Sequence, residues 1–319
     1  MQTQQDEMKM DRVGFTNELC RIVLATLGDE YRTELSEIRK NNGVMKEVLY
    51  IRRENSECVP CFYTEELYHS YCNGEKTEGL ADHMVNIVLN ECDTVRREAQ
   101  TYLKKEWISQ HVFVRLVEIE KNKEWLKDAV YVPILDLAAV VYVLTEDGED
   151  GVKCFLLPKY AWDMLGAGTP EEYLPKLVEN TRRLFPERLW CIENNVKECD
   201  GGWEATLRII EEKGETLYAN QLYVLSNYRK INGAAVILYP ELLRDLYERF
   251  SGNYFVIPSS IHEVLLIKET GEEEEEVFNR MVSEVNEQQV EPEEVLSGHV
   301  YYYSAEDGLS MCRTESHGK

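Results

Sequence analysis

Apolar residues recur at helical spacing at the start of the chain. One stripe is formed by Phe15, Leu19, Ile22, Val23 and Leu27, and intervals of three and four residues are typical of a helix that buries one face. The residues Asn41, Asn42 and Gly43 follow as a stop signal, because asparagine and glycine accept the backbone conformation that ends helices. The pattern therefore predicts helix up to this stop.

The next region passes from strand spacing back to helix spacing. Residues 44–52 and 58–63 are predicted to be extended, and Val48 and Tyr50 alternate with polar neighbours, as in a half-buried strand. Residues 64–127 are predicted to be mainly helical. This prediction depends on two apolar stripes, which are Leu80, Met84, Ile87, Val88 and Val95, and then Val112, Leu116 and Ile119.

A hairpin and a capped helix give the clearest local signals. Residues 133–144 are dense in Val, Leu and Ile, and turn-forming residues surround Gly148, so residues 139–157 are predicted to form a β-hairpin. Farther along, Thr169 is a good N-cap, Pro170 suits the first helical position and Glu172 completes a capping box. A helix is therefore expected to begin at Pro170.

Strand and helix signals alternate through the second half of the chain. The patterns predict strands at residues 221–225, 234–238, 254–257, 263–268 and 298–304. They predict helices at residues 240–250 and 274–286. The tail from Ser310 is expected to be frayed.

Helices come first in this order, and mixed strands and helices with at least one hairpin come after them. That order favours an α+β fold with a mixed or antiparallel sheet and flanking helices, preceded by a mainly helical N-terminal region. The expected domains are residues 1–128, helical with a short two-stranded segment, and residues 129–309, which are α+β. Residues 310–319 are expected to be a disordered tail.

Charge narrows the classes of partner. The 319 residues include 35 Lys and Arg against 59 Asp and Glu, a net charge of -24. Such a surplus of negative charge opposes attraction to the phosphates of nucleic acid and to anionic membrane surfaces. The longest apolar run, residues 130–144, contains Pro133 and Asp136 and is shorter than the roughly 20 residues of a membrane-spanning helix. Neither nucleic acid nor a membrane is expected as a partner.

The start of the chain and its cysteines point to a cytoplasmic protein. The first residues lack the apolar core of a signal peptide. Nine cysteines, an odd number without regular spacing, favour reduced thiols. Cys58 and Cys61 form a C-x-x-C pair that could be a redox dithiol or half of a zinc site. The alternative is two half-buried strand residues, and we favour it because the nearest further ligands are irregularly spaced.

His262 and its neighbours form the most suggestive constellation. His262 and Glu263 match the start of the zinc motif H-E-x-x-H, but Leu266 stands where the second histidine would be. Ser259 or Ser260 could be a nucleophile for His262, although no G-x-S-x-G elbow is present. A turn between two strands explains the serines more simply. A ligand cleft at this strand end is the second interpretation.

Three further polar residues could point into such a cleft. Asp136 lies within an apolar run, where a bonded structural carboxylate is favoured over a catalytic one. Asn180 lies on the capped helix and Asn227 follows a predicted strand, and asparagines at such places more often close turns or cap helices.

Gly168 precedes the capped helix, but Glu171 and Glu172 occupy the turn that a phosphate would need. No metal and no cofactor is therefore expected.

Several longer strings along the chain are distinctive: IEKNK at 119–123, VPILDLA at 132–138, ENT at 179–181, YVLSN at 223–227, GAAVILYP at 233–240, IPSSIHEVLL at 257–266, VNE at 285–287 and HVYYYS at 299–304. In these strings the chain resembles a bacterial family of unknown function, DUF5688. The resemblance covers roughly residues 43–308. Members of that family typically carry an apolar Pro-containing segment where this chain has Cys58 and Cys61, which weakens the metal and redox interpretations further.

The resemblance names relatives and implies no activity, so two hypotheses remain. The first is a non-enzymatic module that binds another protein or a small ligand, because no complete catalytic constellation is visible. Its candidate cleft residues are Ser259, Ser260, His262, Glu263, Asp136, Asn180 and Asn227. The alternative is an unrecognised, hydrolase-like enzyme that uses His262 with Glu263 or Asp136.

Overall fold

The computed structural model describes residues 9–312, except 55, 57–58, 92–97, 99, 150, 200–201, 211–213 and 272–273. The chain divides into two compact units. Unit 1 comprises residues 1–40 and 44–103, and unit 2 comprises residues 41–43 and 104–319. The short 3₁₀ turn Asn41–Gly43 is thus counted with unit 2. Each unit is described by itself.

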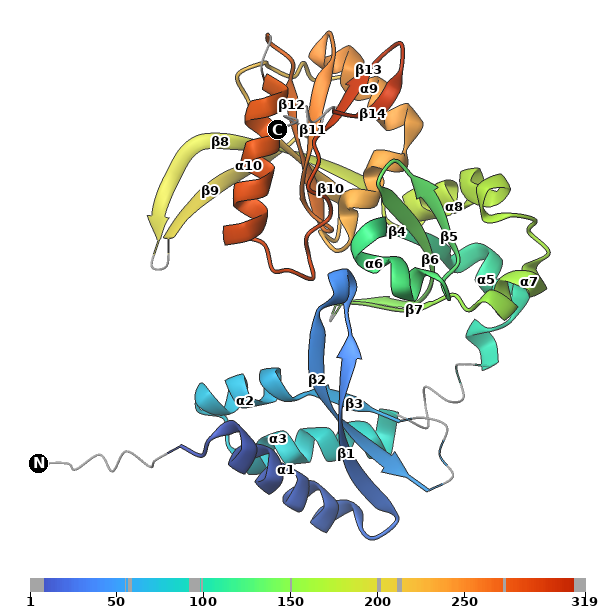
Figure 1. Cartoon of the computed structure of the whole chain (residues 1–319), viewed down its shortest axis with the longest axis vertical. Coiled ribbons are helices and arrows are strands. Elements are labelled where there is room, and N and C mark those ends of the chain that lie inside the picture. The colour runs from blue at the N-terminus through green and yellow to red at the C-terminus, as the bar shows by residue number, and fades with distance from the viewer. Residues whose placement is uncertain are drawn as a thin grey trace, which may run out of the picture. The chain divides into compact units, whose positions relative to one another are not determined.

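Unit 1 packs helices on one side of a three-stranded antiparallel sheet (Figure 1). Its strands are β1 (Tyr31–Arg39), β2 (Met45–Arg53) and β3 (Cys61–Tyr63). Its helices are α1 (Arg12–Leu27), α2 (Thr64–Cys72) and α3 (Thr77–Asn86), which continues into a π-helix at Ile87–Glu91. Asp11 caps α1 by accepting from the backbone N–H of Gly14 at 2.8 Å. Phe15, Leu19 and Val23 of the predicted stripe are buried in the core.

The predicted helix at the N-terminus is confirmed only as far as Leu27. Tyr31–Arg39 is a strand, which pairs with β2 along its whole length, from Tyr31 opposite Arg53 to Arg39 opposite Met45. Gly28, with a φ of 90°, ends the helix before the predicted stop. The N-terminal region therefore mixes helix and strand, because residues 31–39 pair with β2 along one edge.

The first sheet of unit 2 is built around one long strand. Strand β6 (Leu137–Gly148) pairs antiparallel with β4 (Val112–Glu118), β5 (Tyr131–Ile134) and β7 (Gly151–Leu156). The predicted hairpin is confirmed as β6–β7. The helices of this part are α5 (Lys105–His111), α6 (Ile119–Leu126), α7 (Lys159–Leu165) and α8 (Pro170–Leu184). The predicted capping box of α8 is confirmed between Thr169 and Glu172.

Strand β4 overturns a prediction of helix. Val112 and Leu116 are four residues apart, which fits a helix. The residues between and beside them are nearly all buried as well, so both faces of this strand are covered. A continuous apolar run of this length cannot be distinguished from a buried helix by spacing alone. Residues 104–128, which were grouped with the N-terminal domain, are counted with unit 2, because β4 pairs with β6.

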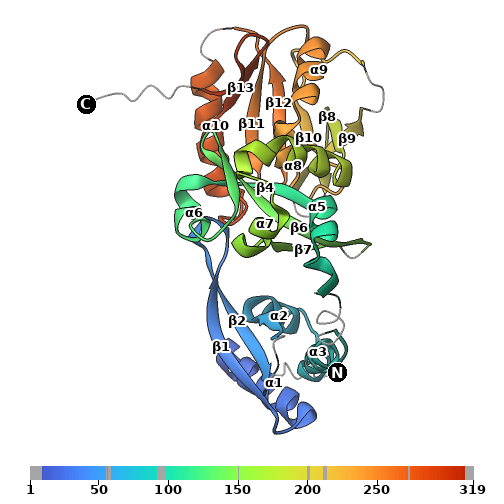
Figure 2. The ribbon, with the colours of Figure 1, turned by 90° about the vertical axis from the view of Figure 1, so that its right-hand side faces the viewer.

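The second sheet of unit 2 has seven strands in the order β14-β13-β11-β12-β10-β8-β9, and every pair is antiparallel. The strands are β8 (Glu187–Cys199), β9 (Gly202–Ile209), β10 (Tyr223–Asn227), β11 (Tyr254–Ser260), β12 (Glu263–Lys268), β13 (Tyr301–Ser304) and β14 (Gly308–Met311). The accompanying helices are the 3₁₀ helix η3 (Gly233–Leu238), α9 (Pro240–Phe250) and α10 (Glu274–Gln288). Figure 2 shows α9 and α10 beside the strands of this sheet. The fold is α+β with antiparallel sheets.

The two faces of this sheet are covered differently. Phe255 and Ile257 of β11 pack with Val282 of α10. Their neighbours Tyr254 and Val256 point to the opposite face and belong to the main core, together with residues of α9, η3 and the first sheet. This is the period of two that a strand buried on both faces requires.

Two predictions in the second half are wrong. Residues 234–238 form η3 and not a strand, because Asn232 adopts the left-handed conformation with a φ of 50° and turns the chain into a 3₁₀ helix at Gly233. The predicted fraying from Ser310 is also wrong for the start of the tail, since Gly308–Met311 pairs with β13. Residues 313–319 lie outside the described part. Among the described residues, no helix is both long and apolar enough to cross a membrane.

Candidate functional site

Both ring nitrogens of His262 are engaged. Nδ1 accepts from the backbone N–H of Asn232 at 3.1 Å, and Nε2 lies 3.3 Å from Oε1 of Glu294. Because Nδ1 accepts, the proton of the neutral ring is assigned to Nε2, which donates to Glu294. A catalytic base needs a nitrogen that can accept from its nucleophile. In this arrangement neither ring nitrogen of His262 is available to accept a proton from a nucleophile.

The serines beside His262 lie at the end of β11, next to the turn to β12. Ser260 pairs with Glu263 across this turn, and a bulge separates Ser260 from Pro258. Oγ of Ser260 accepts from the backbone N–H of His262 at 3.0 Å. Ser259 lies in β11 beside this bulge. The bonds of Ser260 are those of a local turn.

Asp136 is held by two hydroxyl groups at the β5–β6 turn. Its Oδ2 accepts from Oγ of Ser297 at 2.7 Å, and its Oδ1 accepts from the hydroxyl of Tyr301 at 2.8 Å. Ser297 and Tyr301 are fully buried. Burial, together with the charge of Asp136, raises the pKa of Tyr301 far above its ordinary value. Leu135, with a φ of 56°, forms the turn before Asp136, and a leucine in this conformation stores backbone strain.

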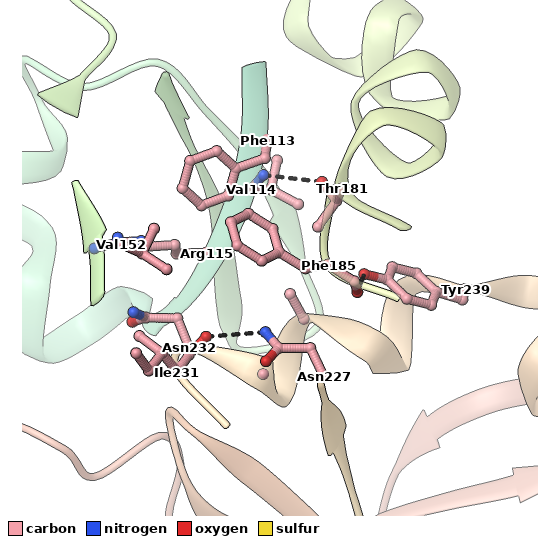
Figure 3. Close-up of a pocket in the computed structure, with 12 residues that line it drawn as sticks. Phe113, Val114, Arg115, Val152, Thr181, Phe185, Asn227, Ile231, Asn232 and Tyr239 are labelled. Atoms are coloured by element: carbon pink, nitrogen blue, oxygen red, sulfur yellow. Dashed lines mark hydrogen bonds between the residues drawn. The ribbon is translucent and has the colours of Figure 1, made fainter. Parts of the chain in front are cut away.

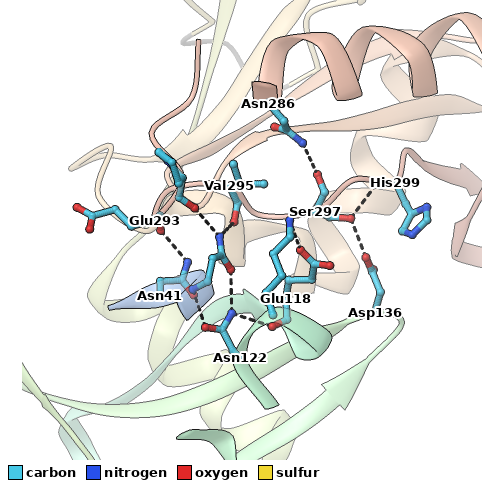
Figure 4. Close-up of polar contacts among 12 residues, drawn as sticks. Asn41, Glu118, Asn122, Asp136, Asn286, Glu293, Val295, Ser297 and His299 are labelled. Carbon is cyan, nitrogen blue, oxygen red and sulfur yellow. Dashed lines mark hydrogen bonds and ion pairs between the residues drawn. The ribbon is translucent and has the colours of Figure 1, made fainter. Parts of the chain in front are cut away.

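The segment 291–300 connects Asp136 to a cluster of asparagines (Figure 4). Asn42 donates through Nδ2 to the carbonyls of Pro292 and Val295, at 2.9 and 2.7 Å. Asn42 and Asn122 also exchange two hydrogen bonds, at 2.7 and 2.9 Å. Asn286 donates to the carbonyl of Ser297 at 2.9 Å. We call this group the segment-291 network.

The other predicted cleft residues have structural partners. Asn180 is buried and donates to the carbonyl of Ser109 at 2.9 Å. Asn227 is also buried, and it donates to the carbonyl of Ile231 and accepts from the backbone N–H of Arg229. Segment 291–300 therefore contacts both His262 and Asp136, but through Glu294 for His262 and through Ser297 for Asp136.

Sequence reasoning missed the residues that make this network. Asn42, Ser297 and Tyr301 were not among the candidates. One signal was available, because several strings that carry the family resemblance meet here. Those strings supply Asn122, Asp136, Asn286, His299 and Tyr301.

The cavity beside Asn227 is too small for a ligand. It is lined by residues of β4, the end of α8 and η3, among them Arg115, Thr181, Phe185 and Tyr239 (Figure 3). Its volume is about 10 Å³, which is room for about one water molecule. The cavity therefore offers no room for a substrate.

A much larger groove lies between α8 and α9. Two cavities of about 770 and 760 Å³ adjoin there, and they share Arg182, Pro186, Glu187 and Glu241. The cavity on the α8 side is also lined by Leu174, Pro175, Val178, Glu179, Arg183, Leu238, Tyr239 and Pro240. The cavity on the β8 side is also lined by Arg188, Leu189, Ile209, Ile210, Leu225, Leu242, Asp245, Leu246 and Arg249. We call the two together the α8–α9 groove.

Arg182 lies where the two halves of the groove meet. It forms a bidentate pair with Glu187, at 2.6 and 3.1 Å, and its Nη1 donates to Glu241 at 2.7 Å. The hydrogen bonds to Glu187 raise the pKa of Arg182. The side chain of Glu241 is 86% exposed, and exposed ion pairs are weak because water screens them. The bond to Glu241 is therefore the replaceable one.

The remaining candidates give no site. Cys58 lies outside the described residues, and Cys61 is an exposed residue that starts β3. Within the described part of the chain, no three His, Cys, Asp or Glu side chains gather as metal ligands would.

The structure defines an α+β protein with antiparallel sheets and a groove of ligand size on unit 2. A model of a family of unknown function, DUF5688, matches residues 13–305. The chain therefore belongs to this family, as the sequence strings indicated. No curated protein and no solved structure matches it.

Proposed function

We propose that this protein is a binding protein, and that it holds a small ligand in the α8–α9 groove without transforming it. The observation that carries this proposal is the groove itself, with halves of about 770 and 760 Å³. Cavities of 300–1,000 Å³ with apolar walls and a few placed polar groups are the usual form of a small-molecule site.

The walls of the groove support this function. Leu174, Val178 and Leu238 supply apolar surface on the α8 side, and Arg182 supplies oriented N–H groups at the centre. Because Arg182 is fixed by two bonds to Glu187, it is positioned before a ligand arrives, which reduces the entropy lost on binding.

The candidate residues for catalysis favour binding over hydrolysis. His262 uses both ring nitrogens in bonds to Asn232 and Glu294, and the carboxylate of Asp136 accepts two hydroxyls. We propose the cytoplasm as the location, since Cys20, Cys61, Cys72, Cys154, Cys191 and Cys312 are all free thiols.

A neutral apolar fluorophore, N-phenyl-1-naphthylamine, tests the proposal on the full chain. Saturable binding of about one molecule per chain is expected. Val178→Trp, which fills the α8 side of the groove, should weaken binding at least tenfold. Met164→Trp on α7 is the matched control, because Met164 is 55% exposed and lies outside the groove lining. Equal binding by both variants, or no saturable binding, would overturn the proposal.

A further inference from the structure

We infer that the ligand of the α8–α9 groove is a small amphipathic anion. Its apolar body would lie on the α8 side, and its carboxylate or phosphate group would lie on the β8 side, near Arg188 and Arg249. This inference rests on the proposed function and adds the chemical class of the ligand.

Arg249 carries the first observation. Its side chain is only 10% exposed, and its Nε donates to the carbonyl of Glu215 at 2.9 Å. Its Nη1 lies 3.5 Å from Asp245, the outer limit of a hydrogen bond. Its Nη2 is buried and has no hydrogen-bond partner. A buried donor without an acceptor is costly, so Arg249, which lines the groove, carries a guanidinium group whose bonding capacity is incompletely used.

Arg188 carries the second observation. It is exposed and lines the same half of the groove as Arg249. Its hydrogen bond goes to the backbone carbonyl of Glu187, and in the described part of the chain no carboxylate lies within 4.0 Å of its guanidinium nitrogens. The net charge of -24 repels anions at long range, so an anion would be held by this local positive charge inside the groove, at short distance.

The two halves differ in the way that an amphipathic ligand requires. On the α8 side, Leu174, Pro175, Val178 and Pro240 form an apolar wall. On the β8 side, the lining combines Arg188 and Arg249 with apolar residues that include Leu225 and Leu246. A ligand that spans both halves would pass Arg182. An incoming anion could there replace the exposed carboxylate of Glu241 on Nη1.

The Arg182–Glu241 pair makes a gain of affinity testable. Glu241→Gln removes a competing negative charge beside the groove and frees part of the bonding capacity of Arg182. Glu241 is 86% exposed, so the fold should tolerate this substitution. Anion affinity should rise about two- to threefold, within the range of exposed ion pairs.

The decisive experiment is calorimetric titration of the full chain with four ligands that share one tail: decanoate, decyl phosphate, decanol and decyltrimethylammonium. The anions should bind at least tenfold more tightly than decanol, and the cation should bind no better than decanol. The comparison of decanoate with decyl phosphate distinguishes the two anionic groups. Raising the salt concentration should weaken only the anions.

Variants of two arginines locate the anionic group. Arg188→Gln should weaken decanoate binding about fivefold, as expected for loss of one partly exposed charge pair. Arg183→Gln is the matched control, because Arg183 is also exposed and lines the α8 side. It should change the affinity less than twofold. Arg249→Gln should give a larger loss, with circular dichroism to show that the variant is folded.

The outcomes separate this inference from the proposed function. If decanol and decanoate bind with equal affinity, and Val178→Trp weakens both, the ligand need not be an anion. That result would overturn this inference, and the groove would remain a binding site. A greater effect of Arg183→Gln than of Arg188→Gln would overturn the placement of the anionic group on the β8 side. Failure of all four ligands and of the neutral fluorophore would overturn the proposed function, and this inference with it.

Discussion

The hydroxyl of Tyr301 donates a hydrogen bond to Oδ1 of Asp136 at 2.8 Å, across 165 positions of sequence. Asp136 lies at the β5–β6 turn of the first sheet of unit 2, and Tyr301 opens β13 of the second sheet. Ser297 donates to the other oxygen of the same carboxylate. Two hydroxyl donors thus solvate the Asp136 carboxylate in place of water, and they connect the two sheets.

Tyr301→Phe should therefore destabilise the protein without changing its fold. The substitution removes a hydrogen bond to a charged group, which contributes about 1.5–3 kcal/mol. Urea unfolding of the full chain should show a loss of this size. Tyr160→Phe is the control, since Tyr160 is 59% exposed and should change stability by less than about 0.5 kcal/mol. A Tyr301→Phe variant as stable as this control would contradict the role given to Asp136.

Buried tyrosines predict a loss of stability in alkali. Burial raises the pKa of Tyr239, Tyr254 and Tyr301 well above the ordinary value, and burial with a hydrogen bond to Glu269 raises the pKa of Tyr302 to about 12. In the unfolded chain these groups ionise near pH 10. Above that pH the unfolded state loses protons that the folded state keeps, so the unfolding free energy falls as the pH rises.

The unfolding free energy should thus be nearly constant up to about pH 9 with respect to these tyrosines, and it should fall between about pH 10 and 12. Tyr254→Phe should flatten this fall by up to about 1.4 kcal/mol per pH unit, the contribution of one proton. Tyr254 is fully buried. The exposed Tyr160, changed to Phe, should leave the slope unchanged. Identical slopes in the two variants would show that Tyr254 ionises in the folded protein.

The sequence correctly predicted elements whose signals lie within the element itself. The capping box at Thr169 and Glu172 needs only its own helix, and it was confirmed. Strand β4 was predicted as helix because its run of apolar residues also fits helical spacing, and only pairing with β6 decides between the two. Residues 31–39 likewise became a strand because β2 lies beside them. Tertiary partners outweigh local preference in both cases.

None of the candidate cleft residues lines the α8–α9 groove. Asp136 was expected to be a bonded structural carboxylate, and it accepts two hydroxyls. Its partners could not be predicted, since Ser297 and Tyr301 lie 161 and 165 positions away. The α8–α9 groove gave no signal in the sequence at all. In the sequence, nothing distinguishes Arg182 and Glu241 from other surface charges. They form a pair because the fold places α9 beside the end of α8.

Gly233 should not tolerate even one added methyl group. A Cβ at this position would lie 2.0 Å from Oγ of Ser226, 2.6 Å from the carbonyl oxygen of His262 and 2.7 Å from the backbone nitrogen of Asn227. Because backbone atoms cannot move away cheaply, Gly233→Ala should cost about 3 kcal/mol or more. The control is Gly298→Ala, where nothing lies within 4 Å of the added atom. The midpoints of thermal unfolding of the two variants should therefore differ. Equal midpoints would contradict the close packing around Gly233.

The tautomer of His262 tests the alternative of a hydrolase. Nδ1 accepts from the backbone N–H of Asn232 at 3.1 Å, so the neutral ring must carry its proton on Nε2, beside Glu294. Long-range ¹H–¹⁵N NMR should therefore show a single Nε2–H tautomer for His262. The exposed His83 is the control, because water imposes no such choice and it should show a mixture.

A base for Ser260 would instead need an unprotonated ring nitrogen turned toward the hydroxyl. In the structure, Oγ of Ser260 accepts from the backbone of His262 and the ring faces Asn232 and Glu294. Hydrolysis of p-nitrophenyl esters by the protein should thus be the same for the unchanged chain and for His262→Gln. A rate that fell at least tenfold in His262→Gln, together with an Nδ1–H tautomer, would restore the hydrolase and remove His262 from its structural role.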